Sequence, residues 1–189
     1  DGDLDLFMAF REQPNRLFRN ELWRRDERGR RVGGTGEPRF TDITDASGLG
    51  DPRRTVGVAW FDMDQDGDLD AFVANQNGDP DGFYRNENGV FTDVAQALGM
   101  DGTPRSEEIG GVGPAVADYD NDGDLDIIVS HIDLRGTATL LRNDGGNRNH
   151  WLGLSLVGRG PASAIGAKVT LTAPSGRQVR VNQWGTSYL

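Results

Sequence analysis

The sequence predicts an all-β protein made of successive units of short strands. The first observation is a long internal repeat whose two full copies align without gaps. The second is a series of short apolar runs bounded by clusters of Gly, Asp and Asn, which is typical of strands joined by tight turns. The third is composition, because 27 Gly and only 35% hydrophobic residues in a 189-residue chain favour many short strands over long helices.

The repeat organises most of the chain. Residues 57–70 and 113–126 each combine an apolar run with an Asp-rich loop, and the two blocks lie 56 residues apart. Residues 1–5 match residues 66–70, so we expect the chain to open inside a third copy of this motif and to be a piece of a longer protein.

The middle unit contains four runs with strand character. They lie at 56–61, 69–75, 82–86 and 90–94. The last two flank Asn88-Gly89, and Asn-Gly favours a two-residue hairpin turn because both positions tolerate a positive φ. The run 71–74 is apolar throughout, as in a strand buried on both faces. Four short strands per repeat are typical of a propeller blade, so the sequence predicts a partial β-propeller of two to three four-stranded blades.

Two segments interrupt the repeat. Residues 21–39 form an Arg-rich insertion where the middle unit has its tight hairpin, and we expect a long loop there. This loop has two interpretations, a basic contact surface or a solvated excursion, and charge runs usually face water. Residues 101–109 predict a polar connection between units.

The repeat ends after Asn143, and a different β-rich module follows. Strands are expected at 151–157, 167–172 and 178–184. We therefore divide the chain into propeller blades, residues 1–148, and the truncated start of a second β-rich module, residues 149–189.

The Asp-rich loops have the spacing of a calcium site. Calcium takes about six to eight oxygen ligands, and carboxylates at alternate positions of a curling backbone point toward one centre. Gly at the sixth position permits the sharp turn, the seventh residue offers its backbone carbonyl, and a ninth carboxylate closes the site. The residues assigned to the first ion are Asp62, Asp64, Asp66, Asp68 through its carbonyl, and Asp70. Those assigned to the second ion are Asp118, Asp120, Asp122, Asp124 through its carbonyl, and Asp126, and the partial, weak third site consists of Asp1, Asp3 and Asp5.

Other interpretations of these loops explain less. An EF-hand needs a Glu at the twelfth position and flanking helices, whereas Val73 and Val129 stand there between strand-like runs. Acidic turns that only face water do not require carboxylates at fixed alternate spacing, and two carboxylates about 4 Å apart repel by roughly 4 kcal/mol at an effective dielectric of about 20. Magnesium prefers a rigid octahedron and keeps its waters, so calcium is the expected ion.

Charge and composition exclude several classes of function. A net charge of −10 disfavours nucleic acid and anionic membrane surfaces. No run approaches the roughly 18 apolar residues of a membrane span, and the chain contains no Cys. His131 and His150 show no triad or zinc spacing, so we do not expect an enzyme. Arg19, Arg85 and Arg142 recur at matching positions and are expected to pair within their sheets.

Beyond these arguments, the pattern resembles a known family. The Asp-rich motif, followed by Leu-Phe-Arg-Asn at 17–20 and Phe-Thr-Asp-Val at 91–94, resembles the FG-GAP/VCBS repeats of integrin-α-like β-propellers over residues 1–143. The tail, which begins with Asn-His-Trp-Leu at 149–152, resembles the start of an ASPIC/UnbV module. This pairing is similar to the cartilage acidic protein family. The resemblance implies a closed propeller in the intact protein, calcium on one face, and a secreted or cell-surface location linked to adhesion.

We therefore expect a non-catalytic, calcium-binding extracellular module that binds a protein or a glycan. Extracellular modules hold calcium at about 10⁻⁴–10⁻³ M, so such sites would be empty in a low-calcium cytoplasm. One alternative is the propeller portion of a carbohydrate-active enzyme, which predicts a cleft with acids that bind no ion. Another is a purely structural role for calcium.

Overall fold

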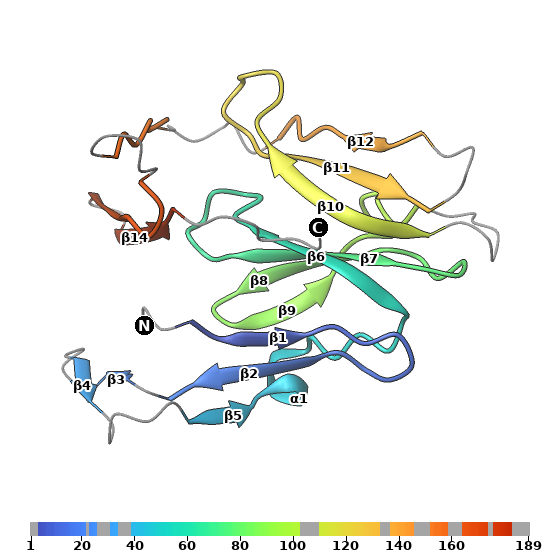
Figure 1. Cartoon of the computed structure of the whole chain (residues 1–189), viewed down its shortest axis with the longest axis horizontal. Helices are drawn as coiled ribbons and strands as arrows, with labels where there is room; N and C mark the ends of the chain where they lie inside the picture. The colour runs from blue at the N-terminus through green and yellow to red at the C-terminus, as the bar shows by residue number, and fades with distance from the viewer. Residues whose placement is uncertain are drawn as a thin grey trace.

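Three antiparallel sheets and two separate two-stranded hairpins make up the described part of the fold. The computed structural model describes residues 4–21, 23–25, 31–33, 39–102, 110–132, 137–145, 152–158, 164–173 and 176–182. Within these ranges the chain is almost entirely β, with one short helix, α1 (Thr44–Ser47). The sheets stack in chain order, the first at the bottom of Figure 1 and the third at the top. The predicted all-β class is therefore confirmed, and the described part contains no helix that could cross a membrane.

The second sheet has four strands in the order β6-β7-β8-β9 and corresponds to the middle unit. Its strands are β6 (Thr55–Phe61), β7 (Asp70–Asn75), β8 (Gly82–Glu87) and β9 (Val90–Asp93). Every strand begins and ends within one residue of its predicted bounds. Asn88 and Gly89 have φ angles of 56° and 87°, which confirms the predicted hairpin turn between β8 and β9.

The first and third sheets each have three strands among the described residues, so the prediction of four strands per blade is confirmed only in the second sheet. The first contains β1 (Leu6–Met8), β2 (Arg16–Asn20) and β5 (Phe40–Asp42). The third contains β10 (Gly111–Ala117), β11 (Asp126–His131) and β12 (Thr139–Leu141). In the third unit the reason lies in the sequence, because no run like Phe91-Thr92-Asp93 follows Asn143.

The Arg-rich insertion differs from the expected long loop. It contains a two-stranded hairpin, β3 (Trp23–Arg25) and β4 (Arg31–Gly33), in which Arg24 lies opposite Val32. Trp and Val favour strands, and pairing satisfies backbone groups that a long excursion would otherwise leave to water. The side chains of this hairpin lie outside the described part of the structure, so neither interpretation of its charge is tested.

The tail contains two of its three predicted strands. β13 (Lys168–Ala173) and β14 (Gly176–Val181) pair with each other and with no other described strand. The predicted strand at 151–157 is wrong, since residues 152–158 have no regular secondary structure. Its Leu residues at 152, 154 and 156 are exposed, and an extended segment without a hydrogen-bonded neighbour is not a β-strand.

Two layers of apolar side chains hold the three sheets together. The layer between the first and second sheets consists of Leu17, Leu49, Ala71, Val73, Tyr84 and Phe91. The layer between the second and third consists of Phe61, Phe72, Ala74, Phe83, Ala95, Ile127 and Val129. β7 supplies side chains to both layers and is buried along its whole length, which explains its unbroken apolar run. Trp60 extends the first layer through edge-on contacts with Phe7 at 5.6 Å and Phe91 at 6.0 Å.

The second and third sheets approach each other closely at strands β6 and β10. A Cβ atom on Gly57 would lie 2.3 Å from the carbonyl oxygen of Val112 and 2.6 Å from Cδ of Pro114. Only glycine permits this backbone approach. The loops that follow β6 and β10 consequently lie at the same end of the stack, on the left in Figure 1.

Candidate metal centre

The two complete Asp-rich loops follow the same backbone course. Gln65 and Gly67 have φ angles of 59° and 104°, and Asn121 and Gly123, their counterparts, have 62° and 98°. The amide of the glycine then donates to the first Asp of the loop, from Gly67 to Asp62 Oδ2 and from Gly123 to the equivalent oxygen of Asp118, at 3.1 Å in both. The sequence repeat is therefore also a repeat of geometry.

Each loop gathers three carboxylates. One oxygen from each of Asp62, Asp64 and Asp70 lies within 4.8 Å of the others, and the equivalent set is Asp118, Asp120 and Asp126. These residues occupy the first, third and ninth positions of the loops. An all-oxygen set of this kind suits a hard dication such as calcium.

The fifth-position carboxylates make a backbone contact instead. Oδ1 of Asp66 accepts a hydrogen bond from the amide of Asp68 at 2.8 Å, and Oδ1 of Asp122 accepts one from the amide of Asp124 at 2.9 Å. The structure thus brings three of the four predicted carboxylates together in each loop and keeps the fourth at the turn. Of the partial third site, Asp1 and Asp3 lie outside the described residues.

The ninth-position Asp joins the loop to the Asn of the recurrent Arg-Asn pair later in its unit. Asp70 accepts hydrogen bonds from the amides of Met63 at 2.7 Å and Asn86 at 2.8 Å. The corresponding bonds join Asp126 to Tyr119 at 3.1 Å and to Asn143 at 2.9 Å, and Asp5 to Asn20 at 2.8 Å. Sequence reasoning did not assign this role to the three Asn residues, although the Arg-Asn pair that recurs in all three units is the signal that could have found it.

Electrostatics favour a cation in these loops. Burial, together with the charges of Asp64 and Asp62, raises the pKa of Asp70 to about 6. Burial and the charges of Asp122 and Asp126 likewise raise the pKa of Asp120. Oδ1 of Asp64 is buried and accepts no hydrogen bond from any described residue. Since carboxylates about 5 Å apart repel by roughly 3 kcal/mol at an effective dielectric of about 20, a bound dication would relieve a real strain here.

Comparison with known proteins agrees with this geometry. A family model of the FG-GAP-like repeat matches residues 1–73 and again residues 62–129. The chain belongs to the FG-GAP-like repeat family. It is 31% identical to cartilage acidic protein 1 of Xenopus tropicalis, and 30% identical to the proteins of that name from Homo sapiens and Mus musculus, over 195 aligned residues.

These relatives define how far the comparison extends. Each alignment covers 100% of this chain and 28% of the relative, so the chain spans about 28% of the length of the curated proteins it matches. The predicted resemblance to FG-GAP repeats and to the cartilage acidic protein family is confirmed. The FG-GAP-like match ends at residue 129, so the ASPIC/UnbV assignment of the tail stays a prediction.

The recurrent Arg residues and one of the two His residues that the sequence singled out also have partners in the structure. The recurrent Arg residues each pair with an acid two residues later. The pairs are Arg19–Glu21, Arg85–Glu87 and Arg142–Asp144, each at 2.6 Å. The expected pairing within a sheet is confirmed for Arg85 and Glu87, which both lie in β8. His131 places Nε2 2.8 Å from Oγ1 of Thr139, while His150 lies outside the described residues.

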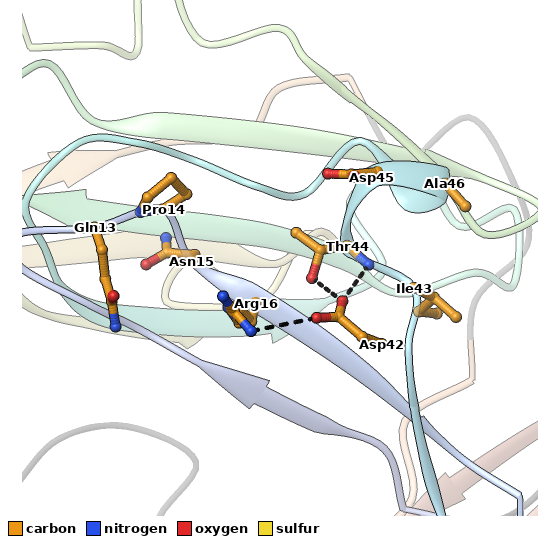
Figure 2. A pocket seen from close by; sticks show the side chains of 9 residues that line it. All are labelled: Gln13, Pro14, Asn15, Arg16, Asp42, Ile43, Thr44, Asp45 and Ala46. Atoms are coloured by element: carbon orange, nitrogen blue, oxygen red, sulfur yellow. Dashed lines mark hydrogen bonds and ion pairs between the residues drawn. The ribbon is translucent and has the colours of Figure 1, made fainter.

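A hollow elsewhere on the FG-GAP sheets offers less to a ligand. This space of about 480 Å³ is lined by residues 13–16 and 42–46, whose side chains are drawn in Figure 2. Asp42 accepts bonds from Oγ1 and the amide of Thr44 at 2.6 and 3.0 Å and pairs with Arg16 at 3.6 Å. Because the Thr44 bonds lower the pKa of Asp42, this acid is ionised and already engaged.

Proposed function

We propose that this FG-GAP-like chain is a non-catalytic calcium-binding module of an extracellular protein, in which ions fix the strand–loop–strand repeats. The observation that carries the proposal is the equivalent clustering of three carboxylates in two successive sheets. The side chains that would hold the ions are Asp62, Asp64, Asp66 and Asp70 in one loop and Asp118, Asp120, Asp122 and Asp126 in the other. The carbonyls of Asp68 and Asp124 would complete the sets, and Asp1, Asp3 and Asp5 would form a weak third site.

Bound calcium would neutralise the repulsion within each cluster. Asp70 and Asp126 are already held by two backbone amides each, so they can bridge the ion to Asn86 in β8 and to Asn143 just after β12. The ion would thereby fix the loop to the sheet whose two strands the loop connects.

We also propose an extracellular setting and an extracellular protein or glycan as partner. The affinity of about 10⁻⁴–10⁻³ M that is typical of extracellular modules matches a calcium-rich medium. The relatives are named for cartilage and for their acidity, and this chain has a net charge of −10. The division into blades at 1–148 and a second β-rich module at 149–189 belongs to the same proposal.

Calcium titration of chelator-stripped protein tests the proposal. Calorimetry should show two sites, and at about 10 mM calcium each should stabilise the fold by about 1.4–2.7 kcal/mol if Kd is 10⁻³–10⁻⁴ M. The melting temperature should therefore rise by several degrees on going from EDTA to calcium, with a much smaller rise in magnesium. Folded protein that shows neither heat nor a melting shift would overturn the proposal.

Matched Asp→Asn variants locate the sites. Asp64→Asn should remove one of the two sites, since Asp64 belongs to the cluster and accepts no hydrogen bond from a described residue. Asp45→Asn is the control, because Asp45 is an exposed acid of α1 that lies outside both clusters. Equal calcium binding by both variants would contradict the assignment.

The alternative, a carbohydrate-active enzyme, needs a pair of carboxyl groups free for acid and base roles. The hollow of Figure 2 offers Asp42 and Asp45. Asp42 is engaged by Thr44 and Arg16 and has a lowered pKa, which is the opposite of what a general acid requires. The geometry therefore favours the non-catalytic proposal.

A further inference from the structure

The two Asp-rich loops contact each other directly. Nε2 of Gln65, in the β6–β7 loop, donates to the carbonyl of Gly123 and to Oδ1 of Asp124 in the β10–β11 loop, both at 3.1 Å. Gln65 lies between two proposed ligands of its own loop, and Asp124 is the seventh-position residue of the other, whose carbonyl is a proposed ligand. This side chain therefore links the parts of the two loops that must be in place for an ion to bind.

A second link runs in the opposite direction. The amide of Asn143 donates to Oδ1 of Asp126 at 2.9 Å, and its side-chain Nδ2 donates to the carbonyl of Met63 at 3.1 Å. The amide of Met63 in turn donates to Oδ2 of Asp70 at 2.7 Å. The ninth-position carboxylates of the two loops are thus joined through two intervening residues.

The side-chain bond of Asn143 to the β6–β7 loop differs from the side-chain bonds of its counterparts. The counterparts of Asn143 bond within their own sheets, Asn20 Nδ2 to the carbonyl of Leu4 at 3.2 Å and Asn86 Nδ2 to the carbonyl of Leu69 at 2.9 Å. Asp124 is 1% exposed, whereas Asp68, its counterpart, is only partly buried. The contact between the loops is therefore a built interface rather than a consequence of the repeat alone.

We infer that Gln65 and Asn143 are positioning residues that couple the two ion sites, so that filling one loop raises the affinity of the other. This inference rests on the proposed calcium function. Both loops must close around their ions, and a loop closed by calcium presents its hydrogen-bonding groups in the arrangement that the other closed loop needs. The links therefore favour the state in which both loops are closed.

Calcium calorimetry on the folded chain measures this coupling. Asp120→Asn leaves only the β6–β7 site and Asp64→Asn leaves only the β10–β11 site. The product of the two stepwise association constants of the unaltered chain should exceed the product of the two single-site constants by about 5- to 10-fold, at the lower end of typical coupling. Asp62→Asn and Asp118→Asn are second silencing variants in case either first choice fails to fold.

Gln65→Ala should abolish this excess of the product of the stepwise constants over the product of the single-site constants. Asn121→Ala is the matched control, because Asn121 occupies the same loop position with a similar positive φ but bonds no described residue. A merely structural role of Gln65 would lower the single-site and two-site constants together and leave the excess unchanged. Asn143→Ala should reduce the excess in the same way as Gln65→Ala.

The outcomes separate the two proposals. Absence of calcium binding in the unaltered, folded chain overturns the proposed function itself. Two sites whose constants show no excess, or an excess that Gln65→Ala leaves intact, overturn the coupling alone. An excess that disappears in Gln65→Ala and survives in Asn121→Ala establishes it.

Discussion

The second and third sheets carry the same loop, yet they differ in how much of each is buried. Phe72 and Phe83 of the second sheet are 0% exposed, because the third sheet covers them. Their counterparts in the third sheet, Ile128 and Leu140, are 46% and 47% exposed. The comparison teaches that a unit of this fold gains its stability from its neighbours, as in other repeat proteins, where nearest-neighbour interfaces dominate.

The largest expected effect sharpens this comparison. Phe72→Ala should destabilise the chain by about 3–5 kcal/mol, because it opens a cavity between two sheets. Ile128→Ala removes a half-exposed side chain at the equivalent position and should cost under about 1 kcal/mol. Urea unfolding followed by circular dichroism measures both. Equal losses would mean that the interface between sheets does not decide stability.

A smaller effect is expected when charge is removed from each of the two loops in the absence of metal. In EDTA, Asp64→Asn should raise the free energy of unfolding by on the order of 1 kcal/mol, because it removes one charge beside Asp62 and Asp70. Asp120→Asn should have a smaller effect, because Asp120 is exposed and Arg142, 4.0 Å away, partly offsets the charges of Asp122 and Asp126 that raise its pKa. Thermal melts in EDTA at low salt measure the difference, and a loss of stability in Asp64→Asn would contradict the repulsion argument.

A third expected effect concerns pH. The pKa of Asp70 is raised from 3.8 to about 6 in the folded chain, so the folded state holds this proton more tightly than the unfolded state. The stabilising contribution of protonated Asp70 is complete below about pH 4 and is lost as pH rises to about 6. Calcium needs the ionised carboxylate, so its affinity should rise across the same interval.

Melts in EDTA and in calcium between these pH values should therefore diverge as pH increases. The control is Asp70→Asn, which removes the titrating group and should flatten both trends. Parallel trends in EDTA and calcium for the unaltered chain would count against proton and ion competing for Asp70.

Sequence reasoning predicted the features that depend on local pattern. The four strands of the second sheet, the Asn88-Gly89 turn and the pairing of the recurrent Arg residues follow from spacing and turn chemistry. The clustering of Asp62, Asp64 and Asp70 follows from alternate spacing around a glycine turn.

The features that sequence reasoning missed depend on neighbours in space. The alternating Leu residues of 152–158 have the period of a strand, but no described strand pairs with them. The contact between Gln65 and Asp124 joins residues 59 positions apart, and only the stacking of the sheets brings them together. The β3–β4 hairpin pairs two Arg-rich runs that have no apolar alternation to indicate it.

The two outer faces of the stack are unlike, and this gives the chain a direction. Leu6 and Met8 of the first sheet are 42% and 40% exposed. They lie on the face that points away from the second sheet, since Phe7 between them contacts Trp60. The third sheet exposes Ile128 and Leu140 on the opposite side. Contact between the first-sheet face of one copy and the third-sheet face of the next would be heterologous, so all copies in the assembly would point the same way. Such an assembly closes into a ring when the rotation per copy divides a full turn, and otherwise grows as an open filament.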